Sequence, residues 1–172
     1  MFTDETEQAT NVLIKKGKFS IGENENEKVF KAFIGRLTSV YRVANDYGYM
    51  YPFKFLSADQ EQEYVIWLNG SQLMNFAQRF ISATDLKKAK ESDFLKLVPY
   101  EMTTEKGHLN RGIQLFKVEK DDKLIELKNA KVEGCPEWVK ITKGAHQGKF
   151  DKADAEDFLY QSLLEIYGET EI

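Results

Sequence analysis

The chain has 172 residues, of which 42% are hydrophobic and 13% aromatic, and its formal net charge at pH 7 is -4. This composition is too apolar for a disordered protein, and no apolar run is long enough to cross a membrane. The single cysteine, Cys135, excludes an internal disulfide and argues against a thiolate zinc site. Together with the polar, acidic start of the chain, these features predict a cytoplasmic protein, either of a cell or of a virus that grows in one.

The charge is distributed unevenly along the chain. Residues 1–8 hold three acids and no base, and residues 151–172 hold seven acids and one base. Residues 9–150 hold 23 bases and 18 acids, which gives this middle part a net charge of +5. A basic body between two acidic ends indicates contact with nucleic acid and an interaction tail, while ordinary surface charge is the alternative because +5 is modest.

The first elements in chain order are β-rich. Residues 12–21 predict a short strand or hairpin, and a polar loop follows at 22–28. A long strand is predicted over 28–43, in which the apolar positions change from even to odd at Gly35. Because side chains alternate strictly along a strand, this change predicts a β-bulge at the glycine. A strand bent there can pair with two sheets and so close a small barrel.

The rest of the body combines strands with one helix. Phe76 and Phe80 recur with other apolar residues at helical spacing after Ser71, a favourable N-cap, and predict a helix over 71–82. Pro99 places its own strand at an edge or a bulge. The strands are predicted over 47–56, 61–68, 94–103 and 111–119, with a sixth apolar piece over 124–127.

The C-terminal part contains a second helix. Its apolar residues recur at helical spacing over 151–167, with Asp151 as the expected cap and Gly168 as the residue that ends the helix. Before it, a tight turn is expected to carry a buried tryptophan, Trp138, and residues 143–150 form a basic, glycine-containing loop. The helix is amphipathic, so we expect it either to dock on the barrel or to pair with a second chain in a homodimer.

The order of elements resembles the OB-fold over roughly residues 28–119: three strands, a helix and two strands, with a bent first strand. The resemblance implies a mainly β protein, a five-stranded OB-type barrel with one helix between strands three and four, plus the C-terminal helix. It divides the chain into an N-terminal extension over 1–27, the barrel over 28–128 and a C-terminal extension over 129–172.

Catalytic and metal-binding motifs are missing from the sequence. It contains no nucleophile elbow, zinc-protease helix, phosphate-binding loop or dinucleotide fingerprint. The two histidines, His108 and His146, lie in separate loops, and neither has a cysteine or a carboxylate at ligand spacing. We therefore expect a protein that is not an enzyme, with no catalytic residue, no metal and no cofactor.

Aromatic residues occupy alternate positions of the second strand, so they share one face unless a bulge intervenes. They are Tyr47, Tyr49, Tyr51, Phe53 and Phe55. Exposed rings of this kind stack on the bases of single-stranded nucleic acid, at roughly 1–3 kcal/mol per base. The alternative is that the face is barrel core, which we expect for the two phenylalanines, whereas the first two tyrosines are expected at the surface.

Basic residues fall near these rings in the predicted barrel. In OB-folds, the face of strands two and three and the loops between strands one and two and between strands four and five bind oligonucleotides. Trp67, on strand three, fits either a stacking platform or the core. The residues expected to bind nucleic acid are Arg36, Tyr41, Arg42, Tyr47, Tyr49, Tyr51, Trp67, Lys106, His108 and Arg111.

The barrel with an acidic end resembles the single-stranded DNA-binding proteins of bacteria and bacteriophages, of the phage type. The resemblance implies binding of single-stranded DNA in replication or recombination, with little sequence specificity, and recruitment of replication proteins by the acidic C-terminal end. No membrane contact is expected. An OB-like protein-interaction or structural module of viral origin is the alternative, in which all the aromatic residues are core, and an enzyme comes third.

Overall fold

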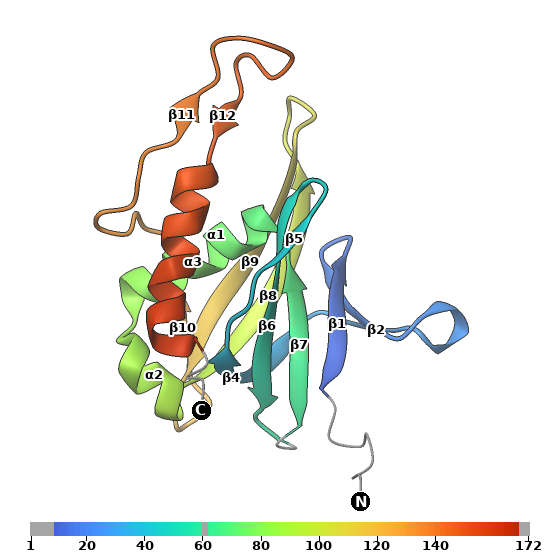
Figure 1. The fold of residues 1–172 in the computed structure, drawn as a ribbon. Coiled ribbons are helices and arrows are strands. Elements are labelled where there is room, and N and C mark those ends of the chain that lie inside the picture. Colours follow the sequence, from blue (N-terminus) through green and yellow to red (C-terminus); the bar gives the residue numbers. More distant parts are fainter. Residues whose placement is uncertain (1–8, 60–61, 169–172) are drawn as a thin grey trace, which may run out of the picture.

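An open, curled sheet forms the body of the molecule, and helices pack along one side of it (Figure 1). The structure is a computed structural model that describes residues 9–59 and 62–168. The strands are β1 (Thr10–Lys15), β2 (Lys18–Ile21), β3 (Lys28–Phe30), β4 (Phe33–Ser39), β5 (Val43–Asn45), β6 (Gly48–Ser57), β7 (Glu63–Leu68), β8 (Phe94–Thr103), β9 (Leu109–Val118) and β10 (Leu124–Leu127). They form one ten-stranded sheet in the order β10-β9-β8-β4-β6-β7-β1-β2-β3, with β5 paired to β6. The predicted mainly β architecture is confirmed.

The five central strands follow the expected order along the chain. β4 lies at the centre and pairs antiparallel with both β6 and β8, which pair in turn with β7 and β9. Helices α1 (Gly70–Ala83) and α2 (Leu86–Ser92) connect β7 to β8, and α1 contacts both β6 and β9. The helix predicted over 71–82 is therefore confirmed as α1, while the expectation of a single helix between these strands is corrected by α2.

The sheet does not close into the predicted five-stranded barrel. Closure would require β7 to pair with β9, but β7 pairs with the parallel strand β1, and β9 pairs with β10. A strand has only two edges, so these neighbours occupy the positions at which the barrel would have closed. The β1–β2 turn reaches over to β8 instead, where Gly17 lies against the backbone of Tyr100 and Glu101. The result is a ten-stranded half-barrel.

The predicted bulge at Gly35 is wrong. The long strand expected over 28–43 is divided into β3, β4 and β5, and the break between β3 and β4 accounts for the change in apolar positions. Gly35 pairs in regular register with Ser57 of β6 and Leu95 of β8. The register of β4 against β6 shifts further along the strand, between Leu37 and Ser39.

Aromatic rings fill the interior of the half-barrel. Phe53 and Phe55 of β6 are fully buried, and each meets Phe76 of α1 edge to face, with ring centroids 6.0 and 6.2 Å apart. Phe33 of β4 packs on Phe55 in the same manner at 5.7 Å. Such pairs contribute about 0.5–1.5 kcal/mol each beyond the area they bury. The aromatic face predicted for β6 is therefore the inner face of the sheet from Tyr51 onward.

α1 begins at a capping box one turn before its first buried residues. Asn69, rather than the expected Ser71, is the N-cap: its side chain accepts a hydrogen bond from the Gln72 N–H at 2.8 Å. The Gln72 side chain accepts one from the Asn69 N–H at 3.0 Å in return. This reciprocal pair satisfies backbone donors that a helix otherwise leaves open at its start.

The C-terminal helix α3 (Ala153–Tyr167) docks on the half-barrel of its own chain. It contacts α1, α2 and β4, and Leu159 and Leu163 are fully buried while Phe158 is partly buried. Of the two arrangements expected for this helix, the structure has the first. Asp151 lies before the N-cap position, yet its carboxylate accepts a hydrogen bond from the Ala153 N–H at 2.9 Å.

The substitution Phe76→Ala should lower the free energy of unfolding by about 3–5 kcal/mol, because it removes a fully buried ring at the centre of the interior. The exposed ring of Phe150 provides a matched control, and Phe150→Ala should cost less than about 1 kcal/mol. Urea unfolding followed by circular dichroism measures both. Equal losses would contradict the central place of Phe76 in the core.

The substitution Gly35→Ala should destabilise the fold by about 1–3 kcal/mol for a steric reason. A Cβ at this position would lie 2.5 Å from the ring of Phe33 and 2.7 Å from the carbonyl oxygen of Leu56. Combining it with Phe33→Leu should recover part of the loss in a double-mutant cycle of urea unfolding. If the two losses in the free energy of unfolding are strictly additive, the Phe33 ring is not the reason why position 35 requires glycine.

Candidate nucleic-acid interface

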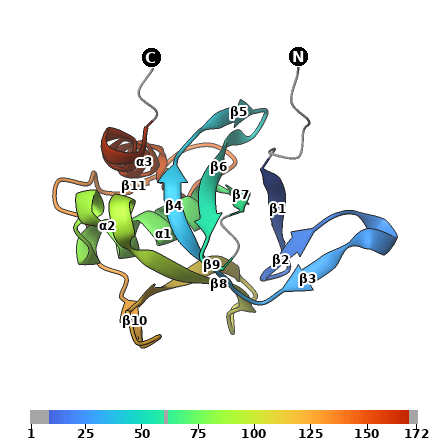
Figure 2. The same cartoon turned by 90° about the horizontal axis from the view of Figure 1, so that it is seen from below.

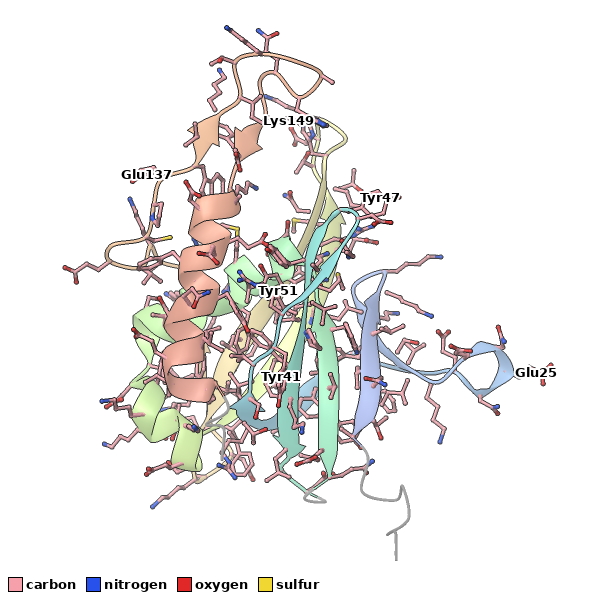
Figure 3. All side chains as sticks on the ribbon, viewed as in Figure 1. Glu25, Tyr41, Tyr47, Tyr51, Glu137 and Lys149 are labelled. Atoms are coloured by element: carbon pink, nitrogen blue, oxygen red, sulfur yellow. The ribbon has the colours of Figure 1, made fainter. Side chains whose placement is uncertain are left out.

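The hairpin formed by β5 and the start of β6, which we call the β5–β6 ribbon (residues 43–50), exposes one aromatic ring almost completely to solvent. Tyr47 lies in the turn of this hairpin and is 98% exposed. Its N–H donates to the side-chain oxygen of Asn45 at 2.8 Å, which orders the turn. Figure 3 shows Tyr47 at the tip of the ribbon, pointing away from the body. The sequence prediction of a surface tyrosine here is confirmed.

Arg42 fastens the base of this ribbon to α3. Its guanidinium makes an ion pair with Asp157 at 2.6 Å and lies over two rings, 4.4 Å from the centroid of Tyr49 and 4.7 Å from that of Tyr160. The hydrogen bond from Arg42 holds the pKa of the Asp157 carboxyl below its usual range. Tyr49 is 44% exposed, so its ring has one side on Arg42 and part of its surface open to solvent.

Tyr51 and Tyr41 differ from the rings at the tip. Tyr51 was expected to bind nucleic acid, but it is fully buried, and its hydroxyl donates to the Glu156 carboxylate at 2.5 Å. Burial raises the pKa of Tyr51 far above its usual range, so the hydroxyl remains a donor. Tyr41 is partly buried near the base of the ribbon, away from Tyr47 (Figure 3).

Two further predicted site residues make contacts within the fold. The Arg36 guanidinium donates to the carbonyl oxygen of Lys90 at 2.7 Å and to that of Glu91 at 3.4 Å, near the end of α2. Trp67 is partly buried on β7, and its indole N–H donates to the side-chain oxygen of Asn11 on β1 at 3.0 Å. These side chains tie elements of the half-barrel together, which the residue types alone do not reveal.

The β8–β9 hairpin carries the remaining predicted residues. Lys106 and His108 are exposed at its tip, where the His108 N–H donates to the Thr104 hydroxyl at 3.1 Å. Arg111 is exposed lower on the hairpin and makes an ion pair with Glu101 at 2.8 Å. This hairpin and the β5–β6 ribbon point to the same end of the molecule (Figure 1), but they lie on different sides of it when seen from below (Figure 2).

A polar recess lies beside the β8–β9 hairpin. It has a volume of about 680 Å³ and is lined on one side by Tyr100 and Arg111 and on the other by Asn75 and Arg79 of α1. Lys152, at the start of α3, also lines it, as does Glu101, the ion-pair partner of Arg111. No sequence pattern singles out Arg79 or Lys152, because one lies on a helix face and the other is the N-cap residue of α3.

Two exposed aromatic residues were also missed. Trp138 is 45% exposed, which corrects the expectation of a buried tryptophan, and Phe150 is 51% exposed. They belong to a separate hairpin formed by β11 (Val139–Lys140) and β12 (Phe150–Asp151). In the sequence, the basic loop over 143–150 indicated an exposed segment here. It did not indicate that the residues on either side of the loop pair as strands.

Comparison of the chain with protein-family models, with curated proteins and with solved structures found no match. Within residues 9–59 and 62–168, no group of three or more His, Cys, Asp or Glu side chains is placed to hold a metal ion. No helix in these same ranges has the length and apolar character needed to span a lipid bilayer.

The substitution Asp157→Asn should remove the ion pair with Arg42 and lower the free energy of unfolding at pH 7 by up to about 1 kcal/mol. Because the folded pKa of Asp157 is depressed, this contribution is present above the ordinary aspartate pKa, about 3.9, and is lost as the pH falls through the lower folded value. The difference between wild type and variant should therefore disappear in acid.

Urea unfolding of both proteins at pH 7 and at successively lower pH measures this difference. Glu165→Gln is the control. Glu165 is an exposed acid of the same helix, and it makes no ion pair with the described residues. A difference between wild type and Asp157→Asn that stays constant down to pH values well below the ordinary aspartate pKa would rule out the ion pair as its source.

Proposed function

We propose that the protein binds single-stranded DNA, without catalysis and with little sequence preference, in replication or recombination. The observation that carries the proposal is the ring of Tyr47, 98% exposed at the tip of a ribbon that Arg42 fastens to α3. An exposed aromatic ring on an ordered hairpin is available for stacking on a base, and every base offers a face for it.

The architecture supports this proposal through its connectivity. We propose that the half-barrel is an OB-type barrel opened by two added strands. Its central strand β4 pairs with both β6 and β8, and α1 lies between β7 and β8 in the chain, as in the OB order. β1 and β10 then occupy the edges of β7 and β9 that would otherwise meet.

The basic residues of the β8–β9 hairpin are placed to contact the phosphates of a DNA strand that crosses this end of the molecule. Lys106, His108 and Arg111 lie on the β8–β9 hairpin, while Tyr47 and Tyr49 lie on the β5–β6 ribbon. Because the two hairpins project from the same end on different sides, one extended strand could contact both only by running across that end (Figures 1 and 2). Aromatic stacking with lysine and arginine contacts to phosphates gives affinity that depends on salt and hardly on sequence.

We also propose that the acidic C-terminal end recruits replication proteins in the cytoplasm in which the protein acts. Residues 151–172 hold seven acids and one base. The apolar face of α3 is buried on its own chain, and Glu156 and Asp157 contact Tyr51 and Arg42. The exposed acids Asp154 and Glu165, which make no ion pair among the described residues, are open to a partner.

A protein-interaction module is the second candidate, and a cavity at the other end of the half-barrel favours it. The cavity has a volume of about 930 Å³, and its apolar lining includes Phe19, Phe30, Phe33, Tyr64 and Phe94. Its charged lining residues are four acids and two lysines. It therefore suits apolar side chains of a protein partner that are flanked by basic residues.

Fluorescence anisotropy with labelled oligo-dT separates the two candidates. Tyr47→Ala should weaken binding by about 1–3 kcal/mol, whereas the control Tyr47→Phe, which keeps the ring, should bind nearly as wild type. Lys106→Ala should weaken binding less and flatten the dependence of log Kd on log salt by about 0.7 to 1 unit. Duplex DNA should bind more weakly, because its bases are already stacked. Micromolar wild-type protein that leaves oligo-dT free at low salt would remove the proposal.

A further inference from the structure

A two-stranded arm projects beyond the end of the half-barrel. We define the arm as residues 138–152, which contain β11, β12 and the loop between them (Figure 1). Val139 pairs with Asp151 and Lys140 with Phe150. Beyond this ladder the Ile141 N–H donates to the carbonyl oxygen of Lys149 at 2.8 Å, so the hairpin continues into the loop.

The arm is positively charged, and its lysines make no ion pair within the part of the chain that the structure describes. It holds four lysines and one acid, Asp151, which gives it a net charge of +3 with His146 neutral. None of the four lysines takes part in an ion pair among the described residues. Figure 3 shows Lys149 of the arm at the same end of the molecule as Tyr47. The lysines of the arm are Lys140, Lys143, Lys149 and Lys152.

Two exposed aromatic rings lie side by side at the base of the arm. The centroids of Trp138 and Phe150 are 6.2 Å apart with an angle of 58° between the ring planes. The ammonium of Lys152 lies 4.2 Å from the centroid of Trp138. A protein gains free energy by burying such rings, yet here both keep about half of their surface in solvent. Apolar rings beside unpaired lysines complement a ligand that is both planar and anionic.

The arm is continuous with the surface of the β8–β9 hairpin. Lys152, which covers the Trp138 ring, also lines the polar recess together with Arg79 and Arg111. A chain of phosphates that runs along this recess from the β8–β9 hairpin would therefore reach the two rings. An acidic peptide would satisfy the lysines but would not supply planar groups in the same number.

We propose that the arm is a second contact element for single-stranded DNA, an inference that rests on the proposed function. Trp138 and Phe150 stack on a base, the arm lysines contact phosphates, and the recess guides the strand between the arm and the β8–β9 hairpin. The contact lengthens the binding site beyond the two hairpins that the sequence indicated.

The intrinsic fluorescence of the full chain tests this contact directly. The chain has two tryptophans, Trp67 and Trp138. With excitation that selects tryptophan over tyrosine, titration with unlabelled oligo-dT should quench the emission of the wild type, and the quenching should disappear in Trp138→Phe, in which Trp67 is the remaining tryptophan. In anisotropy with labelled oligo-dT, Trp138→Ala should weaken binding about 5- to 150-fold, while Trp138→Phe should keep most of the affinity.

Variants of the charged residues and a matched apolar control complete the experiment. Lys143→Ala and Lys149→Ala should each flatten the salt dependence by about 0.7 to 1 unit. Ile125→Ala removes an exposed apolar side chain from β10 and should leave binding unchanged. Circular dichroism checks that every variant is folded.

The outcomes distinguish failure of the arm from failure of the proposed function. If oligo-dT binds the wild type and Trp138→Ala equally and the Trp138 emission does not change, the arm proposal is overturned while DNA binding stands. If polyglutamate, and not oligo-dT, changes the Trp138 emission, the arm binds acidic protein and the proposal is also overturned. If oligo-dT binds neither the wild type nor any variant at any salt concentration, both proposals fail.

Discussion

A continuous series of aromatic contacts keeps the sheet curled around α1, and the rest of the structure depends on it. The series runs from Phe33 to Phe55, Phe76, Phe80 and Tyr167, with centroids 5.4–6.2 Å apart, and so joins β4, β6, α1 and α3. Because no hydrogen-bonded ladder joins β7 to β9, backbone pairing alone does not maintain the curl. Side-chain packing does, and it also fixes α3, the helix on which the β5–β6 ribbon is fastened.

Along the β5–β6 ribbon, the tyrosine side chains change from buried to exposed within a few residues. Along β6 and its turn, Tyr51 is fully buried, Tyr49 is half-exposed and Tyr47 is almost fully exposed. The Tyr51 hydroxyl donates a hydrogen bond to Glu156 of α3, and the Tyr49 ring lies against Arg42, which pairs with α3. Contacts with α3 therefore hold the base of the ribbon in place. If Tyr47 stacks on a base as proposed, a ring at the tip of such a support loses less conformational freedom than a ring on a loose loop would.

The sequence predicted the elements well and their partners poorly, for a physical reason. The apolar spacing of Phe76 and Phe80 identifies α1, because a helix buries one stripe whatever lies opposite. The alternation in β6 shows that its rings share a face, but it does not tell whether that face points inward, and Tyr51 shows that it does. Pairing partners such as β1 for β7, and the bonds that occupy Arg36 and Trp67, depend on segments distant in the sequence.

The strands of the half-barrel run from one end of the molecule to the other, and the two ends differ in character. The arm, the β5–β6 ribbon and the β8–β9 hairpin gather at one end, whereas the cavity lies at the other, where Ala58 follows β6 and Lys120 follows β9 (Figure 1). α3 begins beside the arm and ends near α2, where Tyr167 donates to the carbonyl oxygen of Leu86. The helix therefore carries the chain away from the arm lysines. An exposed acid near its end, Glu165, lies away from those lysines, so the direction of α3 keeps it from pairing with them.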